Sequence, residues 1–355
     1  MTRLITEGFE QADMSGLASD TLWNYTVPNS ELPYIVWGPY VAAGMDYPLV
    51  PRTGRGMMML YANQFIGRDF GLDSGTFPTE LYIGIAFYNG NYASYDFIRA
   101  YTDDPGVFGN YLSVRGIAGG YVQVTRSNTQ IAISAAGAIV VDTWQYMEVW
   151  MKPLDVSGRF VVKIDGTTVI DFTGDTTAEE AWINAIVFGA MSNSINARTF
   201  VDDIVVNDEN GATNNTYPGQ VRLLPIRPAS AGNYAQWDRS GVDLGTDAAQ
   251  VRNGYDFSMM QTTVADEYQT FVPDIPDLPA GATISNIVVR TKGKVEAGAG
   301  VMAPMIRQNA VDDIGSDFTL STGWLWTEET WDLNPDTGVA WVEADLADLE
   351  IGFSS

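Results

Sequence analysis

Hydrophobic and polar residues alternate over much of the first half of the chain. The clearest runs lie at 80–89, 95–103, 111–118, 121–127 and 129–135, with turn-forming residues between them. Alternation with a period of two is typical of antiparallel strands that bury one face. A spacing of about ten residues between such runs is typical of a sandwich. This part of the chain is therefore predicted to be all-β.

The segment 143–173 gives the most detailed prediction. It contains the run TWQYMEVWMK, a loop at Ser157-Gly158, and then two apolar runs separated by Asp165-Gly166. An Asp-Gly pair between two strands is a strong signal for a hairpin. Strand geometry places alternate residues of the first run on opposite sides: Met147, Val149 and Met151 on one, and Tyr146, Glu148 and Trp150 on the other.

A polar cluster rich in Asn and Gly, NDENGATNNTYPG at 207–219, interrupts the strand pattern. We interpret it as a connection between two domains. The predicted organisation is a first domain at 1–208, a linker at 209–220 and a second β-sandwich domain at 221–355. Within the second domain, Glu343–Leu349 is the best candidate for a short helix, and a final strand follows it.

The chain is strongly acidic, with a formal net charge of −25. Residues 1–208 carry 11 Lys and Arg against 23 Asp and Glu, and residues 209–355 carry 8 against 21. The acidity is therefore spread over both halves. Such a surface repels phosphate backbones, so we expect no nucleic-acid partner. The N-terminal residues lack the apolar core of a secretion signal, and no apolar run is long enough for a membrane span, so no membrane partner is expected.

Cysteine and histidine are both absent from the sequence. Disulfides, thiolate nucleophiles and catalytic triads that use His are therefore excluded. A zinc site is not expected either, because His and Cys are its usual ligands. Any catalysis would have to use carboxylates, Tyr, Lys or a hard metal ion.

The passage 143–208 resembles the C-terminal half of a concanavalin A-like, laminin-G-like jelly roll. The resemblance rests on the run WQYMEVWMK, on the hairpin VVKIDGTTVIDFTG and on the closing run FVDDIVVND. The start of the chain, ITEGFE at 5–10, resembles the short first strand that lies beside the last one in such sandwiches. This resemblance implies a jelly-roll first domain.

The order of these parts resembles that in virion proteins of tailed bacteriophages. A closing DD-hydrophobic strand, a link ending in YPG and the run QVRLLPIRP at 220–228 carry this resemblance, together with the ending 334–353. It implies a structural protein on the outer surface of the virion, in the capsid or the tail. Its partners would be other virion proteins, and a homo-oligomer is expected, with a trimer favoured.

Asp202 and Asp203 are the first candidate site. Neighbouring residues of a strand face opposite sides, so the two carboxylates are not expected to act as a catalytic pair. We interpret them as hydrogen-bond acceptors of the strand, with a Ca²⁺ ligand role as the alternative. No other cofactor is expected.

Other acidic groups are weaker candidates. The cluster 207–210 does not have the spacing of an EF-hand loop, and the Asp-Asp-Pro-Gly sequence at 103–106 is typical of a turn. Jelly-roll hydrolases that carry an E-x-D-x-E strand place several acids on one face. The corresponding run here, Met147–Met151, contains only Glu148. This argues against a hydrolase.

Aromatic residues crowd the window 82–101 and recur near 324–341. Such rings can stack on sugars, or can fill cores and subunit interfaces. The residues named as a glycan or interface surface are Tyr82, Tyr88, Tyr92, Tyr95, Tyr101, Trp324 and Trp326.

The sequence thus predicts a structural protein of a phage virion, without enzymatic activity. The alternative is a glycan-binding protein that recognises a host surface glycan. A polysaccharide hydrolase is the third and weakest hypothesis.

Overall fold

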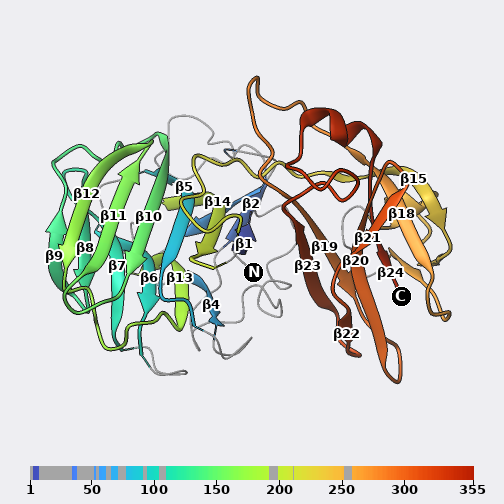
Figure 1. Cartoon of the computed structure of the whole chain (residues 1–355), viewed down its shortest axis with the longest axis horizontal. Helices are drawn as coiled ribbons and strands as arrows, with labels where there is room; N and C mark the ends of the chain where they lie inside the picture. Colours follow the sequence, from blue (N-terminus) through green and yellow to red (C-terminus); the bar gives the residue numbers. More distant parts are fainter. Residues whose placement is uncertain are drawn as a thin grey trace. The chain divides into compact units, whose positions relative to one another are not determined.

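The computed structural model describes residues 3–7, 34–37, 52, 56–60, 65–70, 77–90, 94–103, 109–191, 199–210, 212–251 and 258–355 (Figure 1). These residues belong to two compact units, and the chain passes from the first to the second between Leu223 and Leu224. Most of them lie in β-strands. No helix in these ranges is long and apolar enough to cross a membrane.

The first domain consists of two antiparallel sheets. The larger sheet has eight strands in the order β12 (Thr167–Gly174), β11 (Gly158–Ile164), β10 (Trp144–Lys152), β5 (Leu81–Asn89), β14 (Thr199–Asp208), β3 (Gly56–Leu60) and β2 (Tyr34–Trp37), with β1 (Arg3–Glu7) also paired with β14. The smaller has six, in the order β4 (Phe65–Asp69), β13 (Ala185–Met191), β6 (Tyr95–Tyr101), β7 (Tyr111–Ile117), β8 (Tyr121–Arg126) and β9 (Thr129–Ile133). The predicted pairing of the first strand with the last one is therefore confirmed.

The apolar face of each sheet forms the core between them. Met147, Val149 and Met151 of β10 are fully buried there. Phe87 of the larger sheet meets Phe97 of the smaller one edge to face, with ring centroids 5.0 Å apart. The Asp-Gly turn between β11 and β12 has positive φ at both residues, 49° and 78°, as a two-residue hairpin of this kind requires.

The closing strand β14 departs from regular alternation. A β-bulge lies between Asp202 and Val205 in its pairing with β5, and Asp203 has a φ of 50°. The extra residue turns both carboxylates toward Arg52. The backbone N–H of Arg52 donates to Asp202 (3.1 Å), and its guanidinium donates to Asp203 (2.5 Å). The prediction that the two Asp face opposite sides is therefore wrong, because the bulge breaks the period of two.

Residues 212–223, most of the expected linker, lie across the outer face of the larger sheet; we call them the strap. Two carboxylates on strands of that sheet hold it in place. Glu148 accepts a hydrogen bond from the Gly219 N–H (3.0 Å), and Asp203 accepts one from the Leu223 N–H (2.9 Å). The strap explains why the side of β10 that faces away from the core is also buried, with Tyr146 only 2% exposed.

The second domain is a smaller β-sandwich. Its main sheet has the order β15 (Arg227–Ala235), β18 (Tyr268–Asp274), β24 (Leu349–Ser354), β20 (Gly300–Gln308) and β21 (Val311–Ile314), and β22 (Phe318–Leu320) also pairs with β20. Two separate ribbons are formed by β16 (Asp238–Gly241) with β17 (Ser258–Gln261) and by β19 (Ile287–Gly293) with β23 (Leu325–Trp331). Its described residues also form the short helix α2 (Asp247–Val251) and a 3₁₀ turn at Glu343–Asp348.

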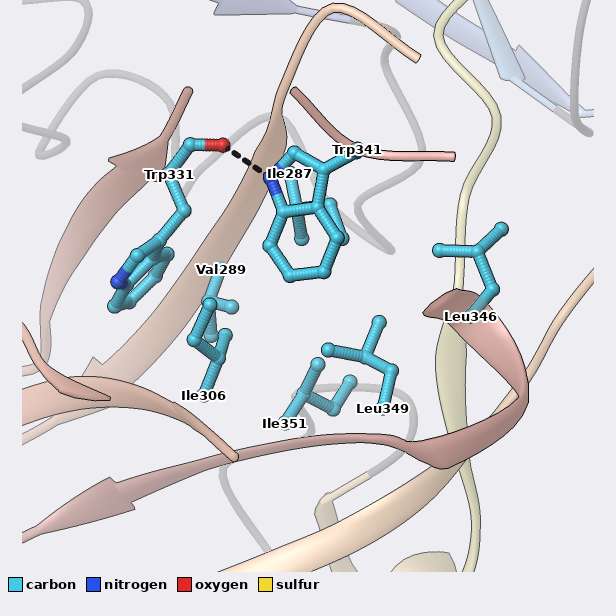
Figure 2. Packing of buried hydrophobic residues seen from close by; sticks show 8 residues of the cluster. All are labelled: Ile287, Val289, Ile306, Trp331, Trp341, Leu346, Leu349 and Ile351. Carbon is cyan, nitrogen blue, oxygen red and sulfur yellow. Dashed lines mark hydrogen bonds between the residues drawn. The ribbon is translucent and has the colours of Figure 1, made fainter. Parts of the chain in front are cut away.

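The core of the second domain lies between the main sheet and the β19–β23 ribbon. Figure 2 shows its eight buried residues: Ile287, Val289, Ile306, Trp331, Trp341, Leu346, Leu349 and Ile351. The Trp341 indole N–H donates to the Trp331 carbonyl oxygen (2.9 Å), so its polar atom is satisfied inside an apolar cluster. Both indoles therefore belong to the core of their own domain. The prediction of an all-β chain, with one sandwich followed by a smaller one, is confirmed.

Candidate functional site

The outer face of the six-stranded sheet carries an unusual group of charged residues. Arg99 lies on β6, Arg115 lies on β7, and Asp96 of β6 lies between them. A bulge in the β6–β7 pairing follows Asp96, between Asp96 and Ile98. Bulges of this kind re-aim a side chain, and here the carboxylate reaches both arginines.

Asp96 orients both guanidinium groups. Its carboxylate accepts a hydrogen bond from Arg99 Nε (2.6 Å) and another from Arg115 Nε (2.5 Å). Asp96 is fully buried, whereas the side chains of Arg99 and Arg115 are 21% and 25% exposed. Arg99 also lies over the ring of Tyr111, 4.4 Å from its centroid. The buried Asp96 thus holds both arginines, while part of each arginine side chain is open to solvent.

The electrostatics keep this group positive. Burial opposes the charge on Arg99, but the contact with Asp96 outweighs burial and raises the pKa of the guanidinium further. Burial raises the pKa of the nearby Tyr101 phenol, and Arg99 offsets this only in part, so the phenol stays protonated at neutral pH. One carboxylate balances two guanidinium groups, which leaves a local surplus of one positive charge in a chain of net charge −25.

Neutral polar groups continue the face beyond the arginines. Ser113 and Thr125 share a hydrogen bond of 2.7 Å between their hydroxyls, and Gln123 of β8 donates to the exposed Gln130 of β9. At the other end of the face, Tyr101 and Tyr111 form a buried cluster with Ala185 and Val187. The exposed part of this face therefore combines oriented cations with amide groups, which suits a ligand that carries a carboxylate.

The tyrosines predicted from the 82–101 window do not converge on one surface. Tyr95 is 1% exposed and packs on Phe97 in the core. Tyr88 is 2% exposed, and its hydroxyl hydrogen-bonds to Asp142 (3.1 Å). Of the four described tyrosines, Tyr101 alone borders the arginine group, and Tyr92 lies outside the described residues.

Tyr82 lies on the outer face of the other sheet, beside the strap. Its ring stacks on Trp150, with centroids 5.8 Å apart, and meets Tyr217 of the strap edge to face at 5.5 Å. Its hydroxyl donates to Glu80 (3.0 Å). Tyr82 therefore helps to fix the strap. Trp324 and Trp326 lie in the second domain and are half-buried on the β19–β23 ribbon.

Asp202 and Asp203 lie where the positive charge is already supplied by Arg52, and both carboxylates are fully buried. Among the described residues, no group of three acidic side chains is placed to hold a metal ion. The observed role of the pair is to anchor Arg52 and the strap. Asp103 accepts a hydrogen bond from the backbone N–H of Asn110 (2.7 Å), and most of the turn predicted at 103–106 lies outside the described residues.

Sequence reasoning missed the Asp96, Arg99 and Arg115 group. The signal was present, because these three are charged residues inside the two apolar runs 95–103 and 111–118, where Asp103 at the end of the first run is the only other charge. Charges inside otherwise apolar runs are expensive to bury unless they are paired. Which of the charges would pair depended on strand register and on a bulge, and neither is readable from the sequence.

Comparison with known proteins assigns no family to the chain. No family model matches the chain, and no curated protein matches it. Similar solved structures include an endo-β-1,4-glucuronan lyase from the fungus Trichoderma reesei, with 13% identity and a TM-score of 0.40 over 58% of this chain and 96% of the lyase. They also include the alginate lyase Aly36B, with 16% identity and a TM-score of 0.32 over 48% of this chain and 92% of the lyase. A third is the carbohydrate-binding module CBM66 from Bacillus subtilis, with 12% identity and a TM-score of 0.30 over 42% of this chain and 86% of the module. At these identities and TM-scores, the similarity assigns no substrate to this chain.

The prediction that the protein is not an enzyme is contradicted, because two of these similar structures are polysaccharide lyases. The prediction rested on the missing His and on the single acid of β10. Both observations argue only against hydrolysis by a His residue or by a pair of carboxylates. Elimination next to a carboxylate needs a positive group that neutralises the acid, and a base that can be Tyr or Lys. The composition of the chain does not exclude such groups.

Proposed function

We propose that the protein binds an acidic polysaccharide on the outer face of the six-stranded sheet. The observation that carries the proposal is the pair Arg99 and Arg115, which a buried Asp96 orients in a strongly acidic chain. A guanidinium group matches the planar geometry of a carboxylate, and part of each guanidinium side chain is exposed. The sugar class proposed is a polyuronate, whose repeating carboxylates would meet this pair.

The test compares the binding of alginate and polyglucuronate with that of a neutral dextran. Arg115→Gln should weaken binding of the acidic polymers about tenfold or more, since a hydrogen bond to a charged group contributes roughly 1.5–3 kcal/mol. Arg115→Lys keeps the positive charge but loses the Nε contact with Asp96, so its affinity for the acidic polymers should lie between those of the wild type and Arg115→Gln.

Arg239→Gln is the matched control, because Arg239 is an arginine of the second domain that is already paired with Asp243 (2.7 Å). Equal binding of dextran and alginate, or an Arg115→Gln protein that is folded and binds as the wild type does, would overturn the proposal. The same mixtures of protein and polysaccharide are examined for shortened polysaccharides with unsaturated ends, which shows whether the protein cleaves the polymer that it binds.

A place on the outside of a phage particle, in a homo-oligomer with other virion proteins, completes the proposal. It is supported by the sequence resemblance of the closing strand, the YPG link and the 220–228 run. An acidic glycan of the host surface would then be the ligand. Mass spectrometry of purified particles tests this part on its own, and absence of the protein from them would remove it while leaving the glycan-binding proposal untouched.

A further inference from the structure

The β19–β23 ribbon of the second domain carries a basic and aromatic surface of its own. The burial of β19 alternates strictly: Ile287, Val289 and Thr291 are buried, and Val288, Arg290 and Lys292 between them are half-buried. Lys294 follows just after the strand. Three of the eight Lys and Arg residues of 209–355 thus lie within five residues of one another, along one side of a ribbon.

Two indoles lie across from these cations. Lys292 is paired in register with Trp326 of β23. Its ammonium group lies 5.4 Å from the ring centroid of Trp324 and 5.6 Å from that of Trp326. Lys294 lies 5.2 Å from the Trp324 ring. The opposite face of the ribbon packs into the domain core through Ile287, Val289 and Trp331 (Figures 1 and 2).

The cations of this ribbon have different partners from those of the arginine group in the first domain. Arg290 is paired with Glu328 across the ribbon (2.9 Å), and Lys294 is paired with the exposed Glu296 (2.7 Å). Lys292 lies between Arg290 and Lys294 along the chain, and its ammonium group is near both indoles. Ammonium groups held near indole faces on a two-stranded ribbon combine an electrostatic contact with an apolar platform.

We infer that the Trp324, Trp326 and Lys292 surface is a second glycan-binding site, which takes an acidic sugar. A sugar ring presents C–H groups that pack on an indole, and its carboxylate meets the lysine. Charge complementarity selects the ligand class, because the surface concentrates cations in the second part of the chain, where residues 209–355 carry 21 acidic residues. The choice of a uronate rests on the proposed function, whereas the site itself rests on the ribbon.

The test counts binding sites by titrating the full chain with a short alginate oligosaccharide. The wild type should bind at two sites. Lys292→Gln and Trp326→Leu should each leave one site, and Arg115→Gln should leave the other. The tryptophan fluorescence change on binding should shrink in Trp326→Leu and persist in Arg115→Gln. Arg239→Gln is again the control, and unfolding midpoints confirm that each variant is folded.

The outcomes separate the two proposals. One site that is lost in Arg115→Gln and unchanged in Lys292→Gln overturns the inference and leaves the proposed function standing. One site that is lost in Lys292→Gln and unchanged in Arg115→Gln overturns the proposed function and leaves the inference standing. A ribbon variant that changes the sedimentation of the protein, with unaltered sugar binding, identifies the surface as an interface between copies of the chain and also overturns the inference.

Discussion

Asp203 shows how a single residue can carry more than one role at a bulge. One carboxylate oxygen accepts the Leu223 N–H of the strap, and the other accepts the guanidinium of Arg52. Its positive φ is one that Asp adopts more readily than most residues do. The same guanidinium donates to the Val221 carbonyl oxygen (2.7 Å) and lies over the Tyr146 ring. Asp203 therefore links the Arg52 guanidinium, the bulged backbone of β14 and the strap.

Replacing Asp203 by Asn should destabilise the first domain by about 2 kcal/mol, because an amide N–H₂ replaces an acceptor and Arg52 loses a buried partner. Denaturant unfolding measures the change. Asp171→Asn removes an acid of the same charge from an exposed pair with Arg159, in which Asp171 is 57% exposed. That control should change stability by less than about 0.5 kcal/mol. Equal effects of the two variants would show that the buried anchor contributes nothing special.

At the scale of elements, the strap is the part that most changes the picture of the first domain. It occupies the outer face of the larger sheet, where it contacts Tyr82 and Trp150 through Tyr217 and lies over β5 through Pro218. Burial raises the pKa of Tyr217 to about 12, so its phenol is neutral at physiological pH. The arginine group lies on the other, smaller sheet, on β6 and β7.

Gly84 of β5 tests how closely the strap is packed. A Cβ at this position would lie 2.1 Å from the Tyr146 hydroxyl and 2.8 Å from Pro218 Cγ. Gly84→Ala should therefore displace the strap and cost about 1–3 kcal/mol. Hydrogen exchange of the Gly219 and Leu223 amides should accelerate at the same time.

Gly300→Ala is the matched control for Gly84→Ala, since its Cβ would meet only ordinary contacts at 3.5 Å or more. It should be neutral or slightly stabilising. Protection of the Gly219 and Leu223 amides that is unchanged in Gly84→Ala would contradict the close packing of the strap on β5.

At the scale of the whole molecule, each unit has its own buried core and its own anchoring carboxylate. In the second domain, Glu350 is 7% exposed and accepts hydrogen bonds from the Asn233 N–H (2.8 Å) and the Thr270 hydroxyl (2.6 Å). Units with separate cores are expected to unfold in separate transitions.

Calorimetry of the full chain should therefore resolve two transitions. Asp203→Asn should lower the midpoint of one, and Glu350→Gln should lower the midpoint of the other, because each change leaves buried donors without an acceptor. A single transition that both variants shift together would show that the two units unfold as one.

Much of the fold could be predicted from the sequence. The strands predicted at 80–89, 95–103, 111–118, 121–127 and 129–135 correspond to β5 to β9 within two residues at each end. Alternation succeeds there because one face of each strand meets the core. It fails at Asp202 and Asp203, where one extra residue shifts the register. The candidate site was predicted far less well, since Tyr88 and Tyr95 serve packing and Tyr82 lies beside the strap.

The sequence by itself determined the strands, the acidic surface and the exclusion of chemistry that needs His or Cys, because these follow from composition and local periodicity. Only the tertiary structure decided which charges meet. Asp96 reaches Arg99 and Arg115, Arg52 reaches Asp203 across 151 positions, and the Asn-rich segment covers a sheet. The reason is that strand register, bulges and chain crossings depend on contacts between segments far apart in the sequence, and these contacts leave no periodic trace in it.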